Sequence, residues 1–344
     1  MPSFQVGGYL ENWQAYGSVP GPFNVVYYSF LTLNQRPNPD APAPIFWNGE
    51  AIYESSCAAD VLEVMTKTEP AWENPNEWAR AKIQPAIDSC RESGVPFMWG
   101  IGGWSDLTKT ITDAQIPKFV EMCVKLLRLG GDGIDFDWEH LSNFKDADPQ
   151  LFRQQRAIVG KTISALRMAL DEAGMEDKHI SYTTRWQCFW TSADASKHAN
   201  AKSFTSDGEC LDTLANMRSV DDVSWINLMI YDAAPYTAFE GVQYFQPEHY
   251  REALNAGVAA GVPKGKLVVG FEPGEQAGGG IWEGFDIDFA VTEEVRSKGF
   301  GGIFFWAMND PRTPRLPETP KSETHQWQGS VGANANYIAR LAGA

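Results

Sequence analysis

The chain has 344 residues, enough for one large domain or two domains of ordinary size. Lys and Arg number 28 and Asp and Glu number 44, so the formal net charge is −16, which makes nucleic acid and anionic membrane surfaces poor partners. No apolar run approaches the roughly 20 residues that a bilayer requires, and we therefore expect a soluble protein.

Segments rich in β-branched and aromatic residues recur along the chain, and most are followed by a segment of helical periodicity. The predicted strands are 5–9, 24–31, 96–101, 133–137, 179–184, 224–230, 266–271 and 302–307. The predicted helices are 51–68, 77–93, 114–129, 149–173, 250–260, 288–298 and 334–341, three of which precede the probable C-cap glycines Gly94, Gly130 and Gly261. This alternation predicts an α/β fold, a closed (β/α)8 TIM barrel, with residues 1–344 as a single catalytic domain.

Three polar or Pro-rich stretches, 34–44, 191–222 and 311–320, follow the second, fifth and eighth predicted strands. In a barrel the carboxyl ends of the strands form the catalytic face. We therefore interpret these extended βα loops as walls of a substrate groove, with ordinary surface loops as the alternative for each one.

The five cysteines are scattered, without a Cys-x-x-Cys pair, at Cys57, Cys90, Cys123, Cys188 and Cys210. This spacing predicts no zinc site, and we expect neither a metal nor a cofactor. The odd number leaves at least one thiol unpaired within the chain. Cys90 and Cys123 lie in helical segments, where we expect them to act as small buried apolar residues.

An acidic run, Asp132–Glu139, contains four carboxylates in an otherwise apolar predicted strand. The period of a strand places Asp135, Asp137 and Glu139 on one face and apolar side chains on the other. Because like charges at alternate positions repel, at least one of these groups should hold a proton at neutral pH and act as an acid. A solvated or ion-paired cluster is the alternative, but the run contains no basic residue.

The acidic run matches Asp-x-x-Asp-x-Asp-x-Glu, and here the chain resembles glycoside hydrolase family 18, which contains chitinases and endo-N-acetylglucosaminidases. Residues 8–13, 24–30 and 302–307 are similar to the family's first, second and eighth strands. Residues 100–104 resemble its third-strand Ser-x-Gly-Gly motif, with Gly100 in place of the serine, and residues 225–232 carry Met-x-Tyr-Asp. His140 stands where the family more often has a tyrosine.

The resemblance implies a role for each acidic residue. Glu139 would protonate the glycosidic oxygen and then activate water. The nucleophile would be the substrate's own 2-acetamido carbonyl, which gives a retained configuration. Asp137 would orient the acetamido group, Asp135 would share a proton with Asp137, and the Tyr231 hydroxyl would hold the acetamido oxygen.

The resemblance also implies substrate-binding residues. Trp306 would form the floor beneath the cleaved sugar, with Met229 and Asp232 in the same subsite, and Tyr9 would hydrogen-bond Asp135. Four further tryptophans are candidates for neighbouring subsites, although packing in the core explains each of them equally well: Trp104, Trp186, Trp190 and Trp282.

We therefore expect an endo-acting chitinase that binds chitin or chitooligosaccharides as a monomer, without nucleic acid or membrane. About 30 residues separate the last two strands, too few for the small α+β domain that some family members insert there, and this implies an open groove. The alternatives are an endo-β-N-acetylglucosaminidase acting on N-glycan cores and a chitin-binding, lectin-like relative. The chain begins without a signal-peptide pattern. We expect a secreted protein whose signal has been removed, and an intracellular protein is the alternative.

Overall fold

The structure is a computed structural model that describes residues 4–11, 21–31, 45–47, 50–52, 77–103, 111–138, 149–191, 208–232, 244–274, 282–309, 339–340 and 342. Eight strands form a closed barrel in the order β1-β10-β9-β8-β7-β6-β5-β2. Their bounds are β1 Gln5–Glu11, β2 Val25–Leu31, β5 Phe97–Gly102, β6 Gly133–Asp137, β7 His179–Arg185, β8 Trp225–Met229, β9 Leu267–Phe271 and β10 Gly302–Phe305. The predicted TIM barrel is confirmed, with all eight strands at their predicted places in the sequence.

The chain divides into two compact units. The first unit comprises Met1–Tyr27, Thr183–Leu211 and Trp225–Ala344, and the second comprises Tyr28–Tyr182 and Asp212–Ser224. The first unit holds β1, β8, β9 and β10, and the second holds β5, β6 and the end of β2, while β7 passes from the second unit to the first. In the part of the chain that the structure describes, no helix is long and apolar enough to cross a membrane.

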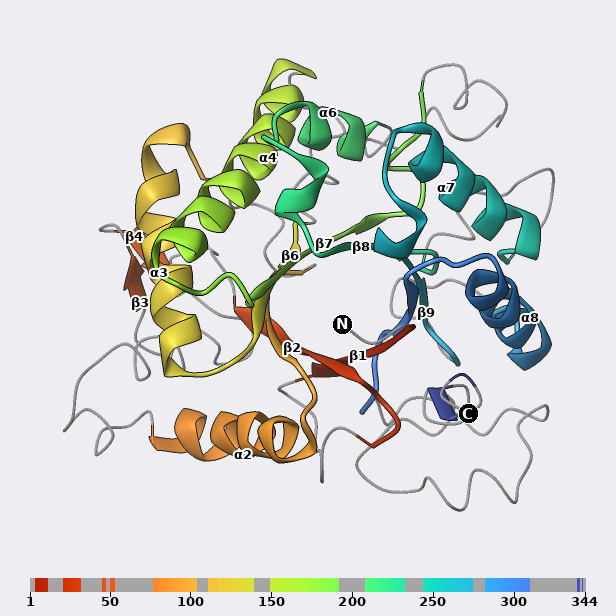
Figure 1. Cartoon of the computed structure of the whole chain (residues 1–344), viewed down its shortest axis with the longest axis horizontal. Coiled ribbons are helices and arrows are strands. Elements are labelled where there is room, and N and C mark those ends of the chain that lie inside the picture. The colour runs from red at the N-terminus through yellow and green to blue at the C-terminus, as the bar shows by residue number, and fades with distance from the viewer. Residues whose placement is uncertain are drawn as a thin grey trace. The chain divides into compact units, whose positions relative to one another are not determined.

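In the second unit, the helices α2 (Glu77–Ser93), α3 (Ile116–Leu129) and α4 (Pro149–Glu172) accompany β5 and β6. The helices α3 and α4 lie side by side (Figure 1). Pro117 in the first turn and Gly130 at the C-cap limit α3, and its buried face packs Phe119 against Phe136 and Trp138 of the acidic run. The apolar face of that run is therefore a core face, as its alternation predicted.

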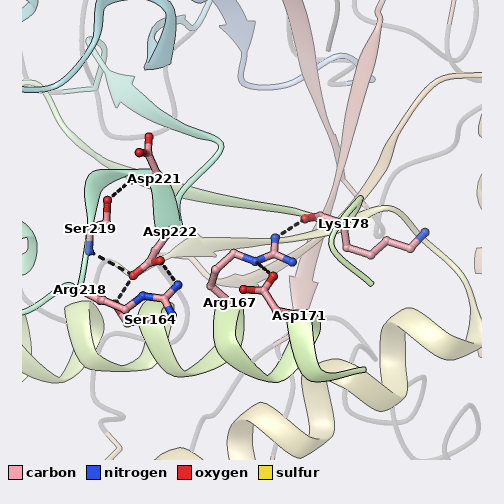
Figure 2. Close-up of polar contacts among 8 residues, drawn as sticks. All are labelled: Ser164, Arg167, Asp171, Lys178, Arg218, Ser219, Asp221 and Asp222. Carbon is pink, nitrogen blue, oxygen red and sulfur yellow. Dashed lines mark hydrogen bonds and ion pairs between the residues drawn. The ribbon is translucent and has the colours of Figure 1, made fainter. Parts of the chain in front are cut away.

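A polar cluster in the second unit joins α4 to the residues that precede β8 (Figure 2). Asp222, which is only 3% exposed, accepts hydrogen bonds from Ser164 and Arg218, both at 2.6 Å. Nearby, Arg167 donates to the carbonyl oxygen of Lys178 at 2.8 Å. These residues precede β7 and β8 and thus belong to the amino ends of the strands, where barrels keep stabilising rather than catalytic groups.

In the first unit, the helices α7 (Pro247–Ala259) and α8 (Phe285–Ser297) lie side by side (Figure 1). The guanidinium of Arg251 on α7 donates to both carboxylate oxygens of Glu294 on α8 at 2.8 Å. Both side chains are partly exposed, so this ion pair contributes less than about 1 kcal/mol, and the apolar packing of Leu254 and Val295 is the main contact with the core.

Two sequence predictions of secondary structure are wrong. The first two residues of the predicted helix 51–68 belong to a strand, because β4 (Glu50–Ile52) pairs antiparallel with β3 (Ile45–Trp47), and residues 53–68 lie outside the described residues. A short helix, α6 (Glu209–Ala215), lies within the stretch 191–222 that was predicted as a loop. The loops 34–44 and 311–320, residues 192–207 of the stretch 191–222, and nearly all of the predicted terminal helix 334–341 lie outside the described residues.

Candidate active site

Asp135 and Asp137, two of the three described acids of the motif, lie on β6 and are buried. Asp135 is 0% exposed and Asp137, the last residue of the strand, is 3% exposed. Their alternate positions put both on the same face at the carboxyl end of the barrel. Glu139 follows Asp137 by two residues and lies outside the described residues, so its predicted role stays a prediction.

Asp135 has a hydroxyl partner from the next strand of the barrel. The Ser181 hydroxyl on β7 donates to its carboxylate at 2.6 Å, and both side chains are fully buried. Sequence reasoning did not single out Ser181 and named Tyr9 instead. The available signal was the alternation of Ser181 and Thr183, which puts two hydroxyls on one face of the strand beside the acidic run.

The end of β5 fits closely around the backbone of Asp137. Gly103 donates its N–H to the carbonyl oxygen of Asp137 at 2.8 Å. A Cβ at Gly102 would collide with that same oxygen, and both glycines have positive φ, 114° and 78°. The Gly-Gly pair thus allows a close approach that other residues would block. Trp104, which follows directly, lies outside the described residues.

The departure at Gly100 has a steric explanation. Gly100 lies opposite Asp135 in the β5–β6 register. A Cβ at Gly100 would lie 2.9 Å from the carbonyl oxygen of Tyr28 and 3.3 Å from the ring of Phe30. A serine therefore does not fit here unless its neighbours shift, and Ser181 supplies a hydroxyl to Asp135 from the other side.

In the first unit, a polar network runs through the barrel interior. The Tyr9 hydroxyl lies 2.8 Å from the Thr183 hydroxyl, which also accepts a hydrogen bond from the Asn227 amide at 2.9 Å. The ring of Tyr9 stacks on Tyr27 with centroids 4.7 Å apart. The stacked ring and the hydroxyl contact together fix the position of Tyr9 on β1. Its predicted bond to Asp135 stays a prediction.

Trp306 lies directly after β10 and is half-buried. The backbone N–H of Trp306 donates to the carbonyl oxygen of Phe271 at 3.0 Å, and the centroid of its indole ring lies 5.5 Å from the ring centroid of Tyr9. An indole that is anchored at its backbone and still partly exposed can offer a face to an apolar surface of a sugar. The predicted role of Trp306 as the floor beneath the sugar stays a prediction.

Tyr231 and Asp232 follow β8 at its carboxyl end. The ring of Tyr231 packs edge-on against that of Phe304, with centroids 6.1 Å apart. A Cβ at Gly270 would lie 2.8 Å from the Tyr231 ring, so the glycine leaves room for that ring. Asp232 has a φ of 59°, in the left-handed region that Asp tolerates better than most residues. Met229 ends β8 and is nearly buried. The roles of all three in binding substrate stay predictions.

Trp186 and Trp190 pack against each other. Trp186 is 1% exposed, and its ring lies 4.6 Å from that of Trp190 and 5.3 Å from that of Phe245. This packing accounts for Trp186 without a sugar. Trp282 donates to Asp288 at 2.9 Å, so its indole has a structural role of its own.

Sequence reasoning missed two further carboxylates at the carboxyl ends of strands in the first unit. Glu11 ends β1 and Glu272 directly follows β9, and both are buried. Asn309 fixes the backbone of Glu11 through two hydrogen bonds of 2.8 and 2.9 Å. Among the described residues, no group of His, Cys, Asp and Glu is arranged to hold a metal ion.

Comparison with known families gives the site its context. A model of the glycosyl hydrolases family 18 matches residues 5–276. The chain belongs to this family. The match includes every predicted site residue from Tyr9 to Asp232, and Trp306 lies beyond its end. A comparison with curated protein sequences found no match.

Solved structures share the fold of this family 18 glycosyl hydrolase. A chitinase from Cycas revoluta in complex with allosamidin is 15% identical over 98% of this chain and 99% of that chain, with a TM-score of 0.59. A class V chitinase mutant from Cycas revoluta in complex with (GlcNAc)3 has the same identity and coverage and a TM-score of 0.60. Catalytic domain 2 of the Ostrinia furnacalis Group II chitinase is 15% identical, covers 98% of this chain and 97% of that chain, and has a TM-score of 0.57. At these identities the likeness shows the fold.

Proposed function

We propose that this family 18 glycosyl hydrolase is a chitinase that cleaves β-1,4 bonds between N-acetylglucosamine residues within a chain. The observation that carries the proposal is the pair of buried acids on β6, Asp135 and Asp137, two residues before Glu139 in a family 18 chain. The similar structures from Cycas revoluta, bound to allosamidin and to (GlcNAc)3, support chitooligosaccharides as the substrate class.

In the proposed reaction, Glu139 gives its proton to the glycosidic oxygen as the bond from that oxygen to C1 breaks. The carbonyl oxygen of the 2-acetamido group attacks C1 and forms a cyclic oxazolinium intermediate. Water then adds to C1, Glu139 takes up its proton, and the acetamide is restored. Two inversions at C1 give overall retention.

Asp137 positions the acetamido N–H and offsets the positive charge that develops on the ring nitrogen of the intermediate. Asp135 acts on Asp137 from the position two residues earlier on the same face, and Ser181 holds the Asp135 carboxylate in place at 2.6 Å. Tyr231 and Trp306 hold the acetamido oxygen and the apolar face of the sugar.

The endo mode of cleavage rests on the connection between β9 and β10. This connection, residues 272–301, carries α8 at Phe285–Ser297 and is about 30 residues long. It leaves no room for an inserted domain that would raise one wall of the groove. We further propose that the enzyme acts outside the cell, because chitin is an extracellular polymer. We also propose that it acts as a monomer.

The test compares the wild type with Glu139→Gln on chitin hexasaccharide and, separately, on a high-mannose glycoprotein. We expect the wild type to release N,N′-diacetylchitobiose, and the variant to lose at least about 1,000-fold in kcat because it lacks the proton donor. Asp113→Asn, at an exposed position on the 3-10 turn before α3, is the control for a lost carboxylate and keeps full activity.

Three results would contradict the proposal in different ways. Deglycosylation with intact chitin oligomers indicates the endo-β-N-acetylglucosaminidase. Binding of oligomers without turnover indicates a lectin. With a partly deacetylated chitin hexasaccharide as a further substrate, cleavage after an unacetylated glucosamine excludes the acetamido group as nucleophile. Mass spectrometry of the new reducing ends detects such cleavage.

A further inference from the structure

We propose that Cys188 and Cys210 form a disulfide bond that ties the start of α6 to the turn that follows β7 in the first unit. The bond closes the long connection between the fifth and sixth strands of the barrel at its base. It would be a covalent modification of the chain independent of the glycosidase activity.

The backbone brings the two residues next to each other. The N–H of Cys210 donates to the carbonyl oxygen of Cys188 at 2.9 Å. Standard bond lengths then limit the separation of the two Cα atoms to about 7 Å, and the bend of such hydrogen bonds reduces it further. Disulfides span Cα separations of about 4.4–6.8 Å, so the pair meets this requirement without movement of the backbone.

The neighbouring residues show that the two segments run side by side in opposite directions. A Cβ at Gly208, two residues before Cys210, would lie 3.4 Å from the carbonyl oxygen of Trp190, two residues after Cys188. Phe189 and Leu211, which directly follow the two cysteines in the sequence, line the same groove against α7. The proximity of the cysteines is therefore a property of both segments and not of a single contact.

The two thiols also face each other. Both are fully buried, and a hydrogen bond joins one thiol to the other. Burial raises the pKa of the Cys188 thiol, and burial together with the bonded Cys188 thiol raises the pKa of Cys210 well above its ordinary value. Such thiols exchange slowly once the protein has folded, so the bond forms during folding and is then protected from reductants.

Oxidation requires an external acceptor, which we take to be a low-molecular-weight disulfide or a disulfide-exchange protein. Both S–H bonds break and one S–S bond forms in the chain. The two electrons and two protons pass to the acceptor disulfide, which becomes two thiols. This step needs an oxidising compartment, which agrees with the expectation that the protein is secreted.

The first test is a peptide map of wild-type protein that has been folded with oxidised glutathione, then denatured, alkylated and digested without reductant. We expect a linked peptide pair that contains Cys188 and Cys210 and disappears on reduction. Cys90 and Cys123, which are buried in other helices, serve as internal controls and should carry the alkyl label. Alkyl label on both Cys188 and Cys210 would overturn the proposal.

The second test separates a covalent bond from simple packing of two thiols. With a bond, Cys188→Ala, Cys210→Ala and the double variant should have the same Tm, about 5 °C below that of the oxidised wild type. Dithiothreitol during unfolding should lower the wild-type Tm to that level and leave the variants unchanged. The bond would be contradicted if the two single variants lowered Tm additively in the double variant and the wild-type Tm did not respond to reductant. The variant Cys123→Ala is the control, because it measures the change in Tm on losing one buried thiol.

Discussion

At Asp135, a fully buried carboxylate depends on a hydroxyl from the neighbouring strand. The same arrangement recurs in the second unit, where Ser164 donates to the buried Asp222 at the same 2.6 Å distance (Figure 2). The first pair lies within β6 and β7, and the second lies outside the strands, on α4 and just before β8. The two serines therefore offer a matched pair of variants for testing whether Ser181 positions the acidic residues or only stabilises the fold.

We expect Ser181→Ala and Ser164→Ala each to lower the free energy of unfolding by about 1–2 kcal/mol, because each leaves a buried acceptor with one donor fewer. Only Ser181→Ala should lower kcat, by roughly 10-fold with little change in KM, and shift the acidic limb of the pH–rate profile. Urea unfolding and steady-state kinetics on chitin tetrasaccharide provide both measurements. Equal effects of the two variants on kcat would rule out a positioning role for Ser181.

The acidic residues of the site could be predicted from the sequence because alternation along one strand puts them on one face. The partner of Asp135 could not, because it depends on which strand lies beside β6 and on the register between them. Gly100 shows the same limit. The sequence shows that Gly100 replaces the family's serine. It does not show that the carbonyl oxygen of Tyr28 and the ring of Phe30 occupy the space that a serine side chain would need.

At the scale of elements, the start of α8 and the residues just before it hold a pair of carboxyl groups, Glu283 and Asp288, away from the predicted catalytic residues. Glu283 and Asp288 are joined by a hydrogen bond, Tyr250 of α7 donates to Glu283, and Trp282 donates to Asp288 at 2.9 Å. Burial raises the pKa of Glu283 to about 7, and burial and the Glu283 charge raise the pKa of Asp288 well above its ordinary value. The two carboxyl groups are packed together without a cation among their described partners.

This pair should make the protein less stable as the pH rises. A carboxyl group whose pKa is higher in the folded state binds its proton more tightly there, so its stabilisation is complete below about pH 4.5 and is lost through about pH 7. We expect a loss on the order of 2–3 kcal/mol across that range. The double variant Glu283→Gln, Asp288→Asn should remove it, whereas Asp286→Asn, an exposed acid in the first turn of the same helix, should not. Parallel pH–stability curves for the wild type and the double variant would contradict this assignment.

The elements that sequence reasoning misjudged have identifiable reasons. The strands β3 and β4 are three residues each; β3 was not predicted, and Ala51 and Ile52 of β4 were read as the start of a helix. The two residues between them, Asn48-Gly49, are the pair that two-residue hairpin connections favour, and this signal was available. The helix α6 is seven residues long and begins after a polar stretch, so it gives too short a period to detect.

At the scale of the whole molecule, eight described strands close the barrel, and the charge of −16 remains to be related to function. A strongly acidic protein attracts cations over distances of about a Debye length. Chitin is neutral, but partly deacetylated chitin carries ammonium groups at each glucosamine. The charge should therefore favour the encounter with partly deacetylated chains, provided that the sugar at the cleaved position keeps its acetyl group.

We expect kcat/KM for a partly deacetylated chitin hexasaccharide to fall about 3- to 10-fold between 20 mM and 500 mM NaCl, because salt screens the attraction. The fully acetylated hexasaccharide, which has the same length and no charge, is the matched control and should change less than about 2-fold. The effect should appear in KM and the association rate rather than in kcat, since the reacting sugar is acetylated in both substrates. An equal salt response of the two substrates would show that the acidic surface does not assist binding and that the charge serves solubility alone.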